Sequence, residues 1–401
     1  MLDKLPRRRR SVFAKREIPK GLKVSGVLIL CLAVVAAGFF TAKWMTEHRQ
    51  TTDAVAQDVT SSPNKPDNKP NQPSNDSENS HTPGNDKPAV DIPSSLDETR
   101  AFYLPHTALL REDLTTTLNT ARKAGFNAVL FDLKDADGNL YYRFDAPQAK
   151  TVNSYTADAF TADGLSVLFA QMRACGLQPI PRLYAFRDDA ACVKLIDARI
   201  CHVDNHSWAW YDGKKENGAK KWLNPYSNVA QGYIQALAQE LKTAGAAAVM
   251  LEGVQFPDKL TSSAYLGDTA ATISKDDLLA AFVASTRATL GADCPLLLGC
   301  TSAGALATDT KIYGGNPLAF GSTTVSPTLS SKVQESVEKM VLRTQVLEES
   351  KKPLLAPVLP ISGLTAAKVS DTLSACIRGG ANGFILYHPD GHYDFGSYNL
   401  P

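Results

Sequence analysis

Several features are missing from this 401-residue sequence, and each absence removes a class of protein. The charges nearly cancel, with 42 Lys and Arg against 41 Asp and Glu, so the overall charge does not indicate a nucleic-acid partner. No Cys-x-x-Cys pair and no Cys/His ligand spacing occurs, which argues against a structural zinc site. No G-x-G-x-x-G follows an apolar run, so the usual sign of a dinucleotide-binding fold is also missing. What remains is an ordinary globular composition with 44% hydrophobic residues.

The charges are unevenly distributed at the N-terminus. Residues 1–23 carry nine Lys and Arg against two acids, and residues 24–42 then contain no charge. Such a run is at the short end of what crosses ~30 Å of hydrocarbon, and the basic flank before it predicts a cytoplasmic N-terminus. We expect a single uncleaved transmembrane helix at 24–42, with everything after it outside the cell. A cleaved signal peptide is the alternative, because Val35-Ala36-Ala37 resembles a cleavage site.

The composition changes again over residues 43–95. The stretch TSSPNKPDNKPNQPSNDSENSHTPGNDKP consists mainly of Pro, Asn, Ser and charged residues, with almost nothing apolar. It cannot form a core, so we expect a disordered linker that lifts a domain at 96–401 off the membrane.

Six cysteines follow the apolar run. Outside the cell they permit disulfides without requiring them, and Cys192 and Cys201 could close a short loop. We expect free thiols, some of them buried.

From residue 96 onward the sequence repeats one local pattern. A helix end, a glycine, a short link and a continuous apolar strand recur, as in TAGAAAVMLEGV and RGGANGFILYH. Continuous apolar strands separated by helices are typical of a parallel sheet covered on both faces. The predicted strands are Ala101–Leu104, Ala128–Leu133, Pro179–Ala185, Ala248–Glu252, Pro295–Cys300, Ser322–Val325, Leu354–Leu359 and Gly383–Tyr387. Eight such strands predict an α/β fold of the (β/α)8 TIM barrel type, and a doubly wound open sheet is the alternative.

Three segments together resemble the putative glycosyl hydrolase domain family of bacterial surface proteins, an α-amylase-like barrel. They are FNAVLFDLKDADGNLYY, PIPRLYAFRDD and WLNPYSNVAQGYIQALAQELKTAGAAAVMLEGVQFP. In the family the last segment usually ends in Asp-Tyr-x-Arg-Phe-Pro, and here EGVQFP at 252–257 takes its place. Strands five and seven, which often end with aspartates in the family, read LLLGCTS and LLAPVLPIS, so several family acidic positions are lost. The resemblance implies a barrel that acts on, or binds, a polysaccharide.

Candidate site residues follow from the barrel, because its chemistry sits at the carboxyl ends of the strands. Glycoside hydrolysis needs two carboxyl groups, about 5 Å apart in retaining enzymes and roughly 6.5–9.5 Å apart in inverting ones. Glu252 is the expected acid and Asp132 the expected base. They lie two strands apart, at roughly 9 to 10 Å, which favours inversion. The alternative for Asp132 is an ion pair with Lys134 or Arg182 that braces the barrel rim.

Other polar and aromatic residues near the strand ends are expected to bind substrate. The stretch HSWAWYDGKKENGAKKWL holds three Trp, and a flat ring can cover the apolar face of a sugar. A small satellite core under this loop is the alternative. The expected substrate-binding residues are Lys134, Asp135, Arg182, Asp188, Trp210, Trp222, Tyr387 and His388.

Two functions stay open at this point. One is a membrane-anchored extracellular glycoside hydrolase, and the other is an inactive barrel that binds glycan or scaffolds an envelope assembly. A metal-dependent deacetylase is a weaker third possibility, because His202, His206, His388 and His392 do not share metal-ligand spacing. No metal, cofactor or nucleic-acid partner is expected, and the sequence does not indicate the sugar, the linkage or the oligomeric state.

Overall fold

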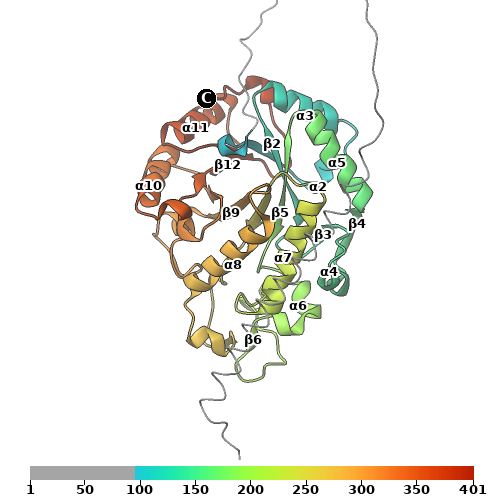
Figure 1. Cartoon of the computed structure of the whole chain (residues 1–401), viewed down its shortest axis with the longest axis vertical. Coiled ribbons are helices and arrows are strands. Elements are labelled where there is room, and N and C mark those ends of the chain that lie inside the picture. The colour runs from blue at the N-terminus through green and yellow to red at the C-terminus, as the bar shows by residue number, and fades with distance from the viewer. Residues whose placement is uncertain (1–94) are drawn as a thin grey trace, which may run out of the picture. The chain divides into compact units, whose positions relative to one another are not determined.

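The eight predicted strands form a closed parallel barrel (Figure 1), and the computed structural model describes residues 95–401. The sheet closes because β1 pairs with both β2 and β13. Closure decides in favour of the (β/α)8 barrel over the open doubly wound sheet. The strands of the barrel, in order around it, are β1 Arg100–Leu104, β2 Ala128–Lys134, β5 Gln178–Tyr184, β7 Val249–Glu252, β9 Leu296–Thr301, β10 Thr324–Thr328, β12 Val358–Pro360 and β13 Phe384–Tyr387.

Long helices surround the strands on the outside, as Figure 1 shows. They are α3 Leu114–Lys123, α5 Ala162–Ala174, α7 Asn228–Thr243, α8 Lys275–Leu290, α10 Val333–Gln345 and α11 Ala366–Arg378. The link between β9 and β10 differs, since it holds only the four-residue α9, Ser302–Ala305, and the 3-10 turn Pro317–Ala319.

Several strand boundaries differ from the prediction. The sixth strand, β10, runs about two residues later than expected. The seventh is split into β11, Leu354–Leu355, and β12, because Pro357 stands between them and cannot donate a ladder hydrogen bond.

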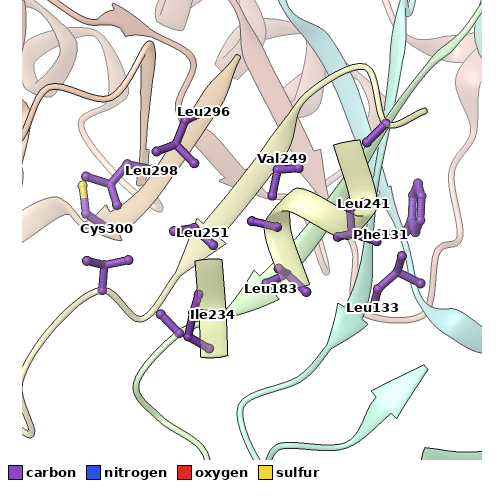
Figure 2. Close-up of a cluster of buried hydrophobic side chains, with 14 of the residues drawn as sticks. Phe131, Leu133, Leu183, Ile234, Leu241, Val249, Leu251, Leu296, Leu298 and Cys300 are labelled. Atoms are coloured by element: carbon purple, nitrogen blue, oxygen red, sulfur yellow. The ribbon is translucent and has the colours of Figure 1, made fainter. Parts of the chain in front are cut away.

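Each barrel strand presents one face outward and one inward, because side chains alternate along a strand. Figure 2 shows outward side chains of neighbouring strands packed with those of α7, among them Phe131, Leu183, Val249, Leu298 and Ile234. A separate cluster fills the inside of the barrel: Ala101, Tyr103, Ala128, Leu130, Ile180, Ala248, Met250, Leu297, Val358 and Ile385. The alternation therefore fixes which residues at the strand ends face the lumen.

Two insertions lie at the carboxyl ends of the strands. After β2 the chain forms β3 Leu140–Tyr142, α4 Pro147–Val152 and β4 Tyr155–Phe160, which extend the sheet. After β5 come the four-residue helix α6, Ala191–Lys194, and the strand β6, Cys201–His202. Strand β6 pairs with β8, Ala264–Tyr265, from the loop after β7. The remaining short helix, α2, covers His106–Leu109.

The N-terminal predictions lie outside the described residues. They are the cytoplasmic segment 1–23, the transmembrane helix 24–42 and the linker up to residue 94. Between residues 95 and 401 no helix is both long enough and apolar enough to cross a membrane. The six cysteines of this part carry free thiols, and all but Cys201 are buried, as expected.

Candidate functional site

The inward face of the barrel changes from apolar to polar at the carboxyl ends of its strands. On β2 the inward residues Ala128 and Leu130 are followed by Asp132, and on β7 Met250 is followed by Glu252. An acid interrupts the apolar run at Asp132 because this position closes the top of the packed lumen. The residues of this polar layer are Tyr103, Asp132, Arg182, Tyr184, Glu252 and Tyr387.

Asp132 is held by three hydrogen bonds. Arg182, its register partner on β5, donates from Nε to Oδ1 at 2.6 Å and from Nη2 to Oδ2 at 3.0 Å. The phenol of Tyr103 donates to Oδ2 at 2.8 Å. Burial, followed by the charge of Asp132, raises the pKa of Tyr103, so the phenol stays a donor. The ion pair expected as an alternative for Asp132 is therefore formed with Arg182 rather than with Lys134.

Three aromatic rings surround the guanidinium of Arg182. Its Cζ lies 5.0 Å from the ring centroid of Tyr103, 5.1 Å from that of Tyr184 and 5.9 Å from that of Tyr387. Burial lowers the pKa of Arg182, but the charge and hydrogen bonds of Asp132 outweigh this and raise it well above its ordinary value. The result is a rigid cation with aromatic walls.

Glu252 is the second carboxyl group of the layer, and it is partly exposed. Among residues 95–401 no ion pair includes it. Its carboxylate lies over Gly299 of β9, where an added Cβ would come within 2.7 Å of Glu252 Cδ and 2.8 Å of Met250 Cε. Burial raises the pKa of Glu252, nearby Arg182 lowers it and Asp132 raises it, with a net shift above the ordinary value.

The barrel mouth therefore holds two unlike carboxyl groups. Asp132 is paired with a cation, and Glu252 holds its proton more tightly than an ordinary glutamate does. Within the described part of the chain, no group of three or more His, Cys, Asp and Glu side chains is placed to hold a metal ion. Such a pair of unlike carboxyl groups is suited to general acid and base chemistry.

The sequence of this barrel matches a family profile. The profile describes a putative glycosyl hydrolase domain and covers residues 101–299, which include Asp132, Arg182, Glu252 and Gly299. This part of the barrel is similar to the family over those residues. The resemblance seen in the sequence is thereby confirmed.

Solved structures similar to this chain include the following three. A hypothetical protein from Ruminiclostridium thermocellum is 20% identical, with a TM-score of 0.42 over 49% of this chain and 96% of its own. A GH20 exo-β-N-acetylglucosaminidase from Vibrio harveyi is 14% identical, with a TM-score of 0.44 over 66% and 41%. A GH20 β-N-acetylhexosaminidase from Streptomyces coelicolor is 11% identical, with a TM-score of 0.46 over 74% and 60%. The chain spans less than two thirds of the length of the Vibrio harveyi and Streptomyces coelicolor enzymes. No curated protein matches the sequence.

Two residues predicted to bind substrate are instead part of the interior of the domain. Lys134 and Asp188 are both 0% exposed and form an ion pair, with Nζ 2.9 Å from Oδ2. Lys134 also donates to the carbonyl of Tyr184 at 2.5 Å, and Asp188 accepts from the Ala191 amide at 2.7 Å. The predicted substrate contact is wrong for both, because the pair ties the end of β2 to the loop after β5 beneath the surface.

Asp135 and His388 also have local partners. Asp135 accepts hydrogen bonds from the amides of Asp137 and Asn139 at 2.9 Å, which fixes the turn between β2 and β3. His388 is partly exposed and lines a rim cleft of about 580 Å³ with His392, next to the lumen residue Tyr387. Direct substrate contact by Asp135 and His388 stays a prediction.

The tryptophan platform is contradicted at both predicted positions. Trp210 and Trp222 are only 3% and 6% exposed and belong to the hydrophobic core. Their indole N–H groups donate to Thr261 Oγ1 at 3.0 Å and to Asp212 Oδ2 at 2.9 Å. The alternative of a buried core is right for both rings, but they join the main hydrophobic core of the domain rather than a separate satellite core.

Sequence reasoning missed Tyr103, Tyr184 and Gly299. Tyr103 stands on a short strand, and Tyr184 follows Arg182 by two residues, so a period of two along the strand was the available signal. Gly299 lies within an apolar strand, where a glycine often marks close approach of another group.

Proposed function

We propose that this protein is a membrane-anchored glycoside hydrolase that cleaves a cell-wall or extracellular polysaccharide. The observation that carries the proposal is Glu252, a partly exposed carboxyl at the end of β7 that stays outside the Asp132–Arg182 ion pair. Burial raises its pKa, as a general acid that must hold its proton requires. The match of residues 101–299 to the profile of a putative glycosyl hydrolase domain supports a carbohydrate partner.

The proposed reaction uses the two carboxyl groups in opposite roles. Glu252 gives its proton to the glycosidic oxygen as the bond from that oxygen to the anomeric carbon breaks. A water molecule bonds to the anomeric carbon from the other face, and Asp132 takes the proton that this water loses. A carboxylate has about four lone-pair sites. Asp132 uses three of them for Arg182 and Tyr103, which leaves one for the water.

The strand order supports inversion of the anomeric configuration. Asp132 on β2 and Glu252 on β7 are separated by β5 alone. Two strand spacings amount to roughly 9 to 10 Å. Inverting enzymes place their carboxyl groups about 6.5 to 9.5 Å apart, with room for the attacking water.

The remaining polar layer fits positioning roles in this mechanism. Arg182 holds Asp132 on one side, and the rings of Tyr103, Tyr184 and Tyr387 wall the lumen above it. Ring faces and phenol groups are suited to the apolar and hydroxyl faces of a sugar.

The anchor and the extracellular location rest on the sequence. Nine Lys and Arg precede the uncharged run at 24–42, which favours a cytoplasmic N-terminus. Protease added to intact cells should cut the Pro/Asn/Ser-rich stretch and release a fragment that starts near residue 96. Protection of that stretch in intact cells would contradict the proposed orientation.

The catalytic roles are tested with Glu252→Gln, which keeps the shape of the side chain and removes its proton. We expect reducing-sugar release by the full chain in detergent to fall by about 10² or more, with little change in glycan affinity. Glu335→Gln on the exposed face of α10 is the matched control and should keep full turnover. Unchanged turnover in Glu252→Gln would remove the acid role, and retention of anomeric configuration in the product would remove the base role of Asp132.

A binding-only barrel is the second candidate, and one observation favours it. Asp132 is engaged by three hydrogen bonds, and the ends of β9 and β12 carry no acid that could replace it. Glycan binding by the wild type without any release of reducing sugar from peptidoglycan, chitin or β-glucan would decide for this candidate.

A further inference from the structure

The loops after β5 and β7 build a small lobe, which comprises residues 199–223 and 261–267. Its centre is the antiparallel pair β6–β8, with Cys201 opposite Tyr265 and His202 opposite Ala264. In Figure 1 the strand β6 lies away from the barrel strands. The first of these loops starts after Tyr184 and the second at Glu252, so both begin in the candidate site.

The lobe exposes a tryptophan on a fixed backbone. The side chain of Trp208 is 59% exposed. Its amide donates to the carbonyl of Asn205 at 2.9 Å, and its carbonyl accepts from the amide of His202 at 2.9 Å. The imidazole of His202 lies 6.1 Å from the indole. The ring is thus offered to solvent at a defined place, whereas Trp210 and Trp222 form the core beneath it.

A second flat surface belongs to the same lobe. The rings of His206 and Tyr265 are stacked, with centroids 3.8 Å apart and an interplanar angle of 9°. The phenol of Tyr265 donates to Asp268 at 3.0 Å, which fixes the direction of this ring. Both rings of the stack are at least partly exposed.

Polar groups surround these rings. A cleft of about 440 Å³ opens next to His202 and is lined by Tyr211, Asp212, Lys259 and Ser263, among others. Besides Trp208, the exposed large apolar side chain of the lobe is Val203, at 48%. This is not the broad apolar patch of a protein interface, which usually extends over several hundred Å². Isolated flat rings amid hydrogen-bonding side chains match a carbohydrate, whose C–H faces stack while its hydroxyls bond.

We propose that this lobe is a second glycan-binding surface, in which Trp208 and the His206–Tyr265 stack hold a polysaccharide chain that extends from the barrel mouth. The inference rests on the proposed function, because it assumes a polysaccharide substrate. It assigns the aromatic contact to residues other than the buried Trp210 and Trp222. A polymer gains from such a surface because contacts at the lobe and at the mouth act on one chain.

The test is co-sedimentation of the full chain in detergent with insoluble peptidoglycan, chitin and β-glucan. Trp208→Ala should raise the dissociation constant for whichever of these polymers the wild type binds by about fivefold or more. This is the order expected from the loss of one ring contact. Trp208→Tyr keeps an aromatic ring and should retain much of the wild-type affinity. Tyr265→Ala should weaken polymer binding, as Trp208→Ala does. Val346→Ala, at a position 85% exposed beyond α10, is the matched control and should bind as the wild type does.

The outcomes separate this inference from the proposed function. If Trp208→Ala binds the polymers as well as the wild type does, the glycan-binding role of the lobe is contradicted. If Glu252→Gln loses turnover in the same series, the proposed hydrolase function is still supported. Binding to none of the three polymers, with no turnover, overturns both. A change of oligomeric state in Trp208→Ala, measured by light scattering without glycan, would assign the surface to self-association and also overturn the inference.

Discussion

Arg182 and Asp132 face each other across β5 and β2 and form a two-pronged ion pair inside the barrel. Their side chains are 6% and 12% exposed, so the pair is largely shielded from solvent. Tyr103 adds a third hydrogen bond to the same carboxylate. This arrangement makes the two residues interdependent, because either charge alone would be buried without compensation.

Removal of the Arg182 guanidinium should therefore destabilise the folded protein. We expect Arg182→Met to lower the free energy of unfolding by about 3 to 5 kcal/mol, measured by urea denaturation. The double variant Arg182→Met/Asp132→Asn should recover part of this loss, since no uncompensated charge remains. Lys339→Ala, which breaks an exposed pair with Glu335, is the control and should change little. Equal stability of Arg182→Met and the wild type would contradict the role of the pair.

The raised pKa of Glu252 gives stability a particular pH dependence. The folded protein binds this proton more tightly than the unfolded chain, whose carboxyl titrates near 4.5. The stabilising contribution is complete below that value and is lost as the pH rises through the folded-state pKa. The stability of the wild type relative to Glu252→Gln should therefore fall as the pH is raised from about 4 to about 8 in urea titrations. A pH-independent difference between the two proteins would contradict the raised pKa.

Gly299 should control the position of Glu252. In Gly299→Ala the new methyl group would collide with the Glu252 carboxylate and with Met250 Cε, both of which are ends of flexible side chains. We expect the fold to persist at a cost of about 1 to 3 kcal/mol, while turnover falls because the carboxyl is displaced. Gly396→Ala, where an added Cβ meets nothing within 4 Å, is the matched control. Full turnover in Gly299→Ala would show that this contact does not position the acid.

Alanine substitutions of the lobe tryptophans should differ in their effect on stability according to how deeply each ring is buried. Trp222→Ala removes a ring that is 6% exposed and should cost about 3 to 5 kcal/mol of stability. Trp208→Ala removes a ring that is 59% exposed and should leave the melting temperature nearly unchanged. Calorimetry on both variants distinguishes these cases, and a large loss of stability in Trp208→Ala would be inconsistent with an exposed ring.

The barrel could be predicted from the residue pattern alone. Continuous apolar strands after helix-ending glycines placed all eight strands, because burial on both faces leaves a pattern that local residues carry. It also placed Asp132, Arg182 and Glu252 at the correct ends of their strands. The boundaries moved where the signal was weak, as in the sixth strand, and where Pro357 splits the seventh.

The partners of these residues, in contrast, depend on how the chain folds. Lys134 stands two residues after Asp132, yet it pairs with Asp188 in the interior, while Asp132 pairs with Arg182 from a neighbouring strand. Three tryptophans share one polar loop, and only folding buries Trp210 and Trp222 and leaves Trp208 outside. Such choices depend on contacts between residues far apart in the chain, and a linear pattern of residue types does not encode which of several nearby charges or rings will meet.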